Sequence, residues 1–323
     1  MSTHNRVLIS AKAFIDHPQY FAPLADAGYE IGICEEGPLS AERLIELLPG
    51  HIAAIAAMDD YNAQVMAQAS DLRVISRWGV GIDNIDLDAA TRHGIVVCNT
   101  PGMVTSAVAD MTFALMLSLA YDIPAAAERG RKGHWVQEKG ADFFGATLGI
   151  IGFGSIGQAV AYRARGFDMR VVAYDPYVDV TQAAKLGVKL TDLSSVIQQA
   201  DYLTLHCNLT EDNYHLIGAE QLAEMKPNAF LINTARGGLV DSAALLDALR
   251  AGQIAGVALD TLEQEPPDPA DPILSAPRCL ITPHNSFYNE TSVRLVNTQV
   301  VQNVLDVMAG RRTQFVLNPE TLR

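Results

Sequence analysis

Basic residues are scarce in this sequence. Of its 323 residues, 23 are lysine or arginine and 37 are aspartate or glutamate, which gives a formal net charge of −14. A surface this acidic repels phosphate backbones and anionic lipid, so neither nucleic acid nor a membrane is expected as a partner. Long apolar runs are also missing: the longest, near residues 111–120, is too short to span a bilayer.

Cysteine is rare as well. The four cysteines are Cys34, Cys98, Cys207 and Cys279, and no two of them have the C-x-x-C spacing of a zinc site, so no metal is expected. They lie in apolar stretches and are expected to be reduced core residues. Residues 1–6 are polar and show no signal-peptide pattern, and together these features lead us to expect a cytoplasmic protein.

Short apolar runs alternate with helical patterns along most of the chain, whose length suggests two domains. In the first part, strands are expected at 7–10, 30–34, 52–57, 74–76 and 95–98. In the second part, strands are expected at 147–151, 170–174, 202–206, 230–233, 256–259 and 280–282. This alternation predicts an α/β protein with two doubly wound parallel sheets, each with helices on both faces.

Two further helices suggest how the domains are connected. Residues 104–120 form a helical pattern that is apolar nearly all round, as in a buried helix. Residues 291–308 have apolar positions at helical spacing, and we expect this helix to return to the first domain. The expected domains are therefore 1–99 plus 289–323, and 100–288.

A glycine motif follows the strand at 147–151. Gly152, Gly154 and Gly157 form G-x-G-x-x-G, and a helical pattern follows at 158–165. Their roles are a tight turn, close approach of the backbone to a pyrophosphate, and close packing of helix on strand. The N-terminus of the helix then offers free N–H groups to the phosphates. The strand, turn and helix together predict a dinucleotide site.

Asp175 stands 18 residues after the last glycine, at the end of the second strand. A carboxylate at this point accepts hydrogen bonds from the adenosine ribose hydroxyls and repels a 2′-phosphate, which favours NAD over NADP. The alternative is a sharp turn followed by an ordinary surface aspartate.

Polar residues stand at or just after the carboxyl ends of the other strands of the second part. They are Asp175, His206, Thr234 with Arg236, Asp260 and His284. Ligands bind at that edge of an open parallel sheet, so these side chains are expected to converge near a bound nicotinamide.

Three residues have the chemistry for hydride transfer with a hydroxy acid. Arg236 offers a fixed charge and paired donors to a carboxylate or carbonyl oxygen. His284 can carry a proton near neutral pH, and Glu265 can orient its imidazole. Two of them also have an ordinary interpretation: His284 as a satisfied loop histidine, and Glu265 as a glutamate in an exposed turn beside Pro266 and Pro267.

Several stretches resemble the D-isomer-specific 2-hydroxyacid dehydrogenases, nearly end to end and in order. They are R-W-G-V-G-I-D-N-I-D (77–86), C-N-T-P-G (98–102), G-F-G-S-I-G-Q (152–158), N-T-A-R-G-G-L-V-D (233–241), A-L-D-T-L-E-Q-E-P (258–266) and T-P-H (282–284). The sequence is most similar to phosphoglycerate-dehydrogenase-like enzymes. The stretches 206–217 and 284–290 also resemble the C-terminal-binding-protein corepressors, which share the fold.

The resemblance implies a Rossmann NAD-binding domain, a flavodoxin-like substrate domain and a cleft between them. It implies that Arg236 binds substrate, that His284 is the general acid/base and that Glu265 is its partner. The implied NAD contacts are Thr112, Gly152, Phe153, Gly154, Ser155, Ile156, Gly157, Asp175, His206, Cys207, Asn208, Asn213, Thr234, Ala235, Asp260 and His284. The implied substrate contacts are Trp78, Gly79, Arg236, Phe287 and the backbone N–H groups of Val80 and Gly81. It also implies a homodimer, with 121–144 as its arm and Trp135 as an anchor.

One departure from the family concerns Asp59 and Asp60, where phosphoglycerate-type relatives often have arginine after the strand. Two carboxylates facing the substrate would disfavour a phosphorylated or dicarboxylic substrate. Alternatively, they are the N-cap and a first-turn acid of the helix over 63–69.

The predicted reaction is reversible hydride transfer between NAD(H) and a 2-hydroxy or 2-oxo acid, with His284 moving the proton and Arg236 stabilising the developing alkoxide. Two alternatives remain. An NAD-sensing corepressor-like protein retains the same three residues, although no disordered tail or basic arm is evident. Oxidation of formate occurs on the same fold, but those relatives have glutamine in place of Glu265.

Overall fold

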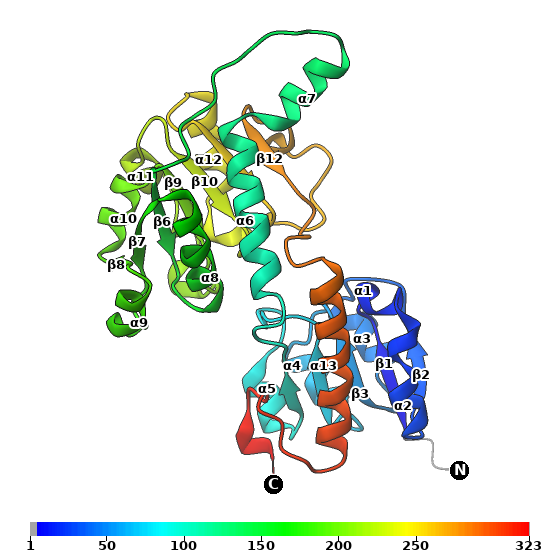
Figure 1. The fold of residues 1–323 in the computed structure, drawn as a ribbon. Helices are drawn as coiled ribbons and strands as arrows, with labels where there is room; N and C mark the ends of the chain where they lie inside the picture. The colour runs from blue at the N-terminus through cyan, green and yellow to red at the C-terminus, as the bar shows by residue number, and fades with distance from the viewer. Residues whose placement is uncertain (1–4, 323) are drawn as a thin grey trace. The chain divides into compact units, whose positions relative to one another are not determined.

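The computed structural model describes residues 5–322. The chain divides into two compact units, a first unit of Met1–Val104 with Tyr288–Arg323 and a second unit of Thr105–Phe287. The first unit is thus built from two separate stretches of chain. The two units are described in turn (Figure 1).

The first unit contains a five-stranded parallel sheet in the order β2-β1-β3-β4-β5. The strands are β1 (Arg6–Ile9), β2 (Glu30–Ile33), β3 (His51–Ala56), β4 (Val74–Arg77) and β5 (Val96–Cys98). β3 is buried along its whole length, as expected for a central strand in which small and branched apolar residues follow His51. The strand order is that of the flavodoxin-like fold, as expected.

Helices pack on both faces of this sheet. They are α1 (Lys12–Ile15), α2 (Ala22–Asp26), α3 (Ala41–Leu47), α4 (Ala63–Gln68), α5 (Leu87–Arg92) and α13 (Glu290–Met308). α13 returns from the end of the chain and lies along β4 (Figure 1), burying Val293, Val296, Val300 and Val304 at helical spacing. Side chains of Ser40, Asn62, Asp86 and Asn289 cap the N-termini of α3, α4, α5 and α13.

The second unit contains a seven-stranded parallel sheet in the order β12-β11-β10-β9-β6-β7-β8. The strands are β6 (Thr147–Ile151), β7 (Arg170–Tyr174), β8 (Lys189–Leu190), β9 (Tyr202–Leu205), β10 (Phe230–Asn233), β11 (Gly256–Leu259) and β12 (Cys279–Ile281). The order reverses between β6 and β9, which is the switch point where a Rossmann sheet binds its ligand. The predicted fold class is confirmed. The edge strand β8 was not predicted, because it has two residues and no apolar run.

The helices of the second unit are α6 (Thr105–Ala120), α7 (Ile123–Arg131), α8 (Ser155–Ala164), α9 (Val180–Lys185), α10 (Leu193–Gln199), α11 (Ala219–Glu224) and α12 (Ser242–Arg250). Single 3₁₀ turns over the two units cover Pro18–Tyr20, Arg165–Phe167, Glu211–Asn213, Gly237–Leu239, Pro272–Ser275 and Pro319–Thr321. Figure 1 shows α7 and the extended chain after it projecting from the body of this unit. Among the described residues, no single helix could cross a membrane by length and composition, although α6 and α7 together meet that test across a 59° bend. α6 is largely buried in the core of the second unit.

Candidate active site

Two glycines in the loop between β6 and α8 are required by its shape. Gly152 has a φ of 90°, and a Cβ there would overlap the backbone of His206 and Cys207. A Cβ on Gly157 would overlap the carbonyl oxygen of Gly152, so α8 packs directly on the end of β6. Gly154, in contrast, has open space beside it among the described residues.

The first turn of α8 faces this open space without a side-chain cap from any described residue. Residues 155–157, which begin the helix, present backbone N–H groups that can donate hydrogen bonds to an anion. These groups form a cradle that suits a pyrophosphate. The loop therefore fits the dinucleotide that the motif predicted.

Asp175 follows β7, beside this loop. Its Oδ2 accepts a hydrogen bond from Phe153 N at 2.7 Å, and its Oδ1 accepts one from Tyr177 N at 2.8 Å. Both bonds fix the carboxylate at the rim of the cradle while lone pairs remain for ribose hydroxyls. Asp175 thus lies beside the loop where a ribose ligand is expected, and its contact with NAD stays a prediction.

His206 and Cys207 lie where β9 ends. Burial lowers the pKa of His206 to about 3, so its imidazole is neutral, and Nε2 lies 3.0 Å from Thr204 Oγ1. Burial also raises the pKa of Cys207 to about 11, which keeps the thiol protonated. Both side chains are therefore uncharged, and the backbone of these two residues lies against Gly152 of the glycine loop.

The remaining expected cofactor contacts hold neighbouring loops in shape. Asn213 Nδ2 donates to Asn208 O at 2.7 Å and closes the loop after β9. Thr112 on α6 is fully buried, and its Oγ1 lies 3.4 Å from Thr234 Oγ1 after β10. Ala235 N donates to the Asn233 side chain at 3.0 Å. Their contacts with NAD stay predictions.

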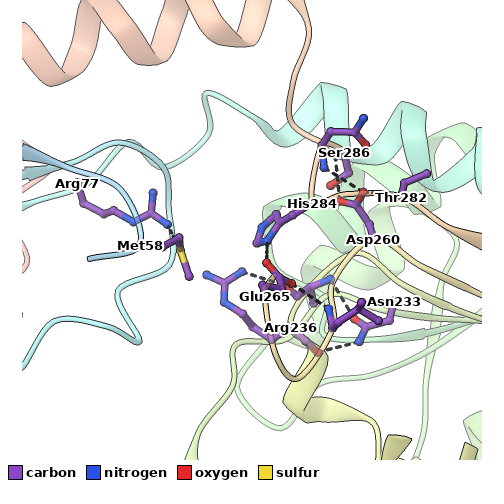
Figure 2. Close-up of polar contacts among 12 residues, drawn as sticks. Met58, Arg77, Asn233, Arg236, Asp260, Glu265, Thr282, His284 and Ser286 are labelled. Carbon is purple, nitrogen blue, oxygen red and sulfur yellow. Dashed lines mark hydrogen bonds and ion pairs between the residues drawn. The ribbon is translucent and has the colours of Figure 1, made fainter. Parts of the chain in front are cut away.

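Arg236 is presented by a tightly fixed turn after β10. The buried Asn233 donates from Nδ2 to Arg236 O at 2.7 Å, and Arg236 Nη1 donates to Ala235 O at 2.7 Å. The next residue, Gly237, packs so closely on the backbone of Leu262 and Glu263 that a Cβ would overlap it. Figure 2 shows the guanidinium extending beside Glu265.

His284 and Glu265 form a close pair (Figure 2). His284 Nδ1 lies 2.6 Å from Glu265 Oε2, and the two side chains are 27% and 32% exposed. Because an ionised carboxylate only accepts, Nδ1 carries the proton and Nε2 is left to exchange one with a substrate. Phe287 lies edge-on to the imidazole, with ring centroids 6.0 Å apart.

Asp260 organises the loop that carries His284. Its buried carboxylate accepts from Thr282 Oγ1 at 2.6 Å, Asn285 N at 3.1 Å and Ser286 N at 2.9 Å. His284 N also donates to Asp260 O at 2.9 Å, which supports the left-handed backbone of His284 at a φ of 48°. Asp260 thus fixes His284, and its contact with NAD stays a prediction.

In the first unit, the turn over residues 78–81 is held by its carbonyl groups. Arg77 donates to the carbonyl oxygens of Trp78 and Gly81, Asn99 Nδ2 donates to Val80 O at 2.8 Å, and Thr100 N donates to Gly79 O at 2.9 Å.

Every carbonyl of this turn is therefore directed into the unit. Among residues 5–322, the N–H groups of Gly79, Val80 and Gly81 have no acceptor within the first unit, so they are available to a carboxylate. The Trp78 ring is buried, and its Nε1 donates to Asn297 Oδ1 at 2.6 Å. Trp78 thus anchors the turn to α13.

Sequence reasoning missed Arg77 and Asn99, which shape this turn. The sequence did contain one signal, the glycine at position 79, two residues after Arg77. In the structure Gly79 has a φ of 132°, and a Cβ there would overlap the Arg77 guanidinium. Arg77 Nη2 also lies 3.2 Å from Met58 Sδ (Figure 2).

Both interpretations of Asp59 are wrong. Its side chain is 0% exposed and accepts from Ser10 Oγ at 2.6 Å, Leu39 N at 2.9 Å and Ala57 N at 3.2 Å. It therefore holds the loop after β3 in place, and its carboxylate is not accessible at the surface of the first unit. The N-cap of α4 is Asn62, not Asp59 or Asp60.

Comparison with known proteins identifies the family. A sequence model described as the NAD binding domain of D-isomer specific 2-hydroxyacid dehydrogenases matches residues 113–286. The chain is 39% identical to a glyoxylate reductase of Korarchaeum cryptofilum over 90% of this chain and 89% of the relative. The chain belongs to the D-isomer specific 2-hydroxyacid dehydrogenase family. The resemblance and NAD as the cofactor are confirmed.

Two further relatives extend the comparison. A D-3-phosphoglycerate dehydrogenase of Methanocaldococcus jannaschii is 39% identical over 87% of this chain, which spans only 54% of that relative. The crystal structure of an Aquifex aeolicus D-lactate dehydrogenase, complexed with NAD and lactic acid, superposes with a TM-score of 0.86 at 27% identity and covers 97% of this chain and 99% of that one. The family's fold therefore extends over nearly the whole chain.

Proposed function

We propose that this protein is an NAD-dependent D-2-hydroxyacid dehydrogenase that interconverts a small D-2-hydroxy acid and its 2-oxo acid. The observation that carries the proposal is the His284–Glu265 pair, with 2.6 Å between its polar atoms, at the carboxyl edge of the sheet that also carries the glycine loop. A proton carrier and a dinucleotide cradle at one edge are the two parts that hydride transfer requires.

In the proposed reduction, the glycine loop and the first turn of α8 would hold NADH, which would supply the hydride for C2 of the oxo acid. His284 Nε2 donates the proton to the carbonyl oxygen, while Glu265 stabilises the charged imidazole. Arg236 stabilises the negative charge that develops on that oxygen. We assign the substrate carboxylate to the N–H groups of residues 79–81 in the first unit.

The substrate class follows from the carboxylate site and from the relatives. Those named above act, by their names, on glyoxylate and on phosphoglycerate, and the D-lactate dehydrogenase was crystallised with lactic acid. Because Asp59 is engaged inside the first unit, it gives no reason to exclude a phosphorylated acid. None of these relatives is named as a corepressor, so the alternative non-enzymatic function gains no support.

Turnover of a substrate panel tests the proposal. Purified protein with NADH is offered glyoxylate, pyruvate, hydroxypyruvate, phosphohydroxypyruvate and branched 2-oxo acids, and consumption of NADH is recorded. His284→Ala should lower kcat by about 10²-fold or more with little change in the Kd for NADH. The exposed His93→Ala is the matched control and should keep full turnover. Absence of turnover on the whole panel, or full turnover by His284→Ala, would contradict the assignment.

We also propose a homodimer formed through 121–144. This segment exposes Trp135, Val136 and Phe144 at 91%, 67% and 73%, an apolar surface that suits a subunit contact. Light scattering should give a dimer for the native chain and a shift toward monomer for Trp135→Asp. Tyr162→Asp, which changes an aromatic residue exposed at 63% on α8, should remain dimeric. If the native chain were a monomer, or if Trp135→Asp remained fully dimeric, the proposal that residues 121–144 form the dimer contact would be wrong.

A further inference from the structure

Three loops of the second unit meet beside the His284–Glu265 pair. The loop after β10 contributes Gly237, which packs on the backbone of Leu262 and Glu263 without room for a side chain. The adjacent Gly238 would place a Cβ 3.1 Å from the Tyr214 ring and 3.1 Å from Leu209. The backbone of residues 262 and 263 therefore packs against the loop that follows β10, and that loop packs in turn against the loop that follows β9.

Glu263 is the side chain that ties these loops together. Its Oε1 accepts from Ser242 N at 3.0 Å, at the start of α12. Its Oε2 accepts from Tyr214 Oη at 3.1 Å and lies 3.2 Å from His215 Nε2. His215 stacks on Tyr214 with ring centroids 4.0 Å apart and lies 3.7 Å from Asp241 through Nδ1.

Glu263 is charged in this setting. Burial alone would raise its pKa, but the hydrogen bonds from Ser242, His215 and Tyr214 outweigh that effect, so the pKa is lowered. A carboxylate with donors from two separate loops is a fixed attachment point for the segment that carries it.

That segment also carries Glu265. Leu262 N donates to Glu265 Oε1 at 2.9 Å, and the other oxygen of Glu265 holds His284 at 2.6 Å. The Leu262 N–H therefore holds one oxygen of the Glu265 carboxylate while His284 holds the other. Leu262 directly precedes Glu263, so the stretch of backbone that Glu263 fixes includes the residue that carries this N–H group.

We propose that Glu263 is a positioning residue of the active site, which fixes the Leu262 N–H and through it the orientation of Glu265 toward His284. It touches neither substrate nor cofactor in this role. The inference rests on the proposed function for its effect on rate, but its structural part can be tested without any substrate.

The experiment compares Glu263→Gln and Glu263→Ala with the native enzyme. Glu224→Gln is the matched control, because Glu224 also accepts two side-chain hydrogen bonds, from Ser194 and Gln198, in the same unit. We expect kcat to fall about tenfold in Glu263→Ala, since small displacements of catalytic groups lower rates by such factors, with the KM for NADH unchanged. Glu263→Gln retains an acceptor for Ser242 and should fall less, whereas Glu224→Gln should match the native rate.

The tautomer of His284 provides the readout that does not depend on turnover. The holoenzyme, with NAD bound, is labelled with ¹⁵N-histidine, and the His284 signals are identified by their loss in His284→Asn. In the native protein and Glu224→Gln, Nδ1 should be the protonated nitrogen. In Glu263→Ala the signals should shift toward a mixture of both tautomers, because Glu265 no longer holds the imidazole in one orientation.

The outcomes separate this inference from the proposed function. An unchanged His284 tautomer together with native kcat in Glu263→Ala would overturn the inference, even if the melting temperature fell, because only a structural role would then remain. If the native protein turned over no 2-oxo acid, the proposed function would fail, and the tautomer comparison alone would still decide the role of Glu263.

Discussion

His206 should make the second unit less stable in mild acid. Burial lowers its pKa from 6.5 to about 3, so the folded protein does not take up this proton until the pH is near 3. The unfolded chain takes it up near pH 6.5. Between these values the unfolded state binds more protons, and the free energy of unfolding therefore falls as the pH falls. From pH 7 to pH 5, the loss from this single group is about 2 kcal/mol.

Urea denaturation of the ligand-free protein at pH 7 and pH 5 measures this loss. All other titrating groups contribute equally to the native protein and to His206→Asn, so the difference between their pH dependences isolates the imidazole. The variant should lose about 2 kcal/mol less than the native protein over this range. The exposed His93→Asn is the control and should behave as the native protein. Equal losses in the native protein and His206→Asn would refute the reasoning.

Three further substitutions test the loops around the site. Gly157→Ala places a Cβ against the carbonyl oxygen of Gly152, so titration with NADH should show at least about tenfold weaker binding; an unchanged Kd would refute the packing argument. Asp175→Ala should weaken NADH about tenfold or more while NADPH binding is spared, and an unchanged ratio of the two Kd values would remove the argument for NAD. Asp59→Asn should lower the free energy of unfolding by about 3 kcal/mol in urea denaturation, because buried donors lose a charged acceptor; a change below about 0.5 kcal/mol would show that the carboxylate is not needed.

The sheets could be predicted because their signals are local. β6, β7, β10 and β11 have the bounds that were predicted, since the interior of a parallel strand covered on both faces must be apolar. The same holds for the glycine motif, whose turn, helix start and strand follow one another within a few residues. Strand ends were less certain: β9 ends at Leu205, one residue before the expected end, because the polar His206 already belongs to the loop.

The carboxylates that hold the loops of the site in place could not be predicted in the same way, because each one accepts hydrogen bonds from segments that are distant in sequence. Asp59 is satisfied by Ser10 and Leu39, and Glu263 by Tyr214 and Ser242. Nothing near an aspartate in the sequence shows which distant donor will reach it. The pattern of residues 56–62 even favoured a helix cap, because aspartate is a good cap and a helix does begin at Ala63.

These hydrogen-bonded carboxylates also change how the acidic composition of the chain is interpreted. Asp59 and Asp260 are buried, and each accepts three hydrogen bonds, while Glu263 and Asp175 are partly buried and accept at least two each. Loops at the carboxyl ends of parallel strands expose backbone N–H groups that the sheet does not use, and a carboxylate can accept several of them at once. Part of the net charge of −14 is therefore structural and contributes little to a repulsive surface. With these carboxylates engaged in hydrogen bonds, the fixed positive charge that the proposed site offers to an anionic substrate is that of Arg236.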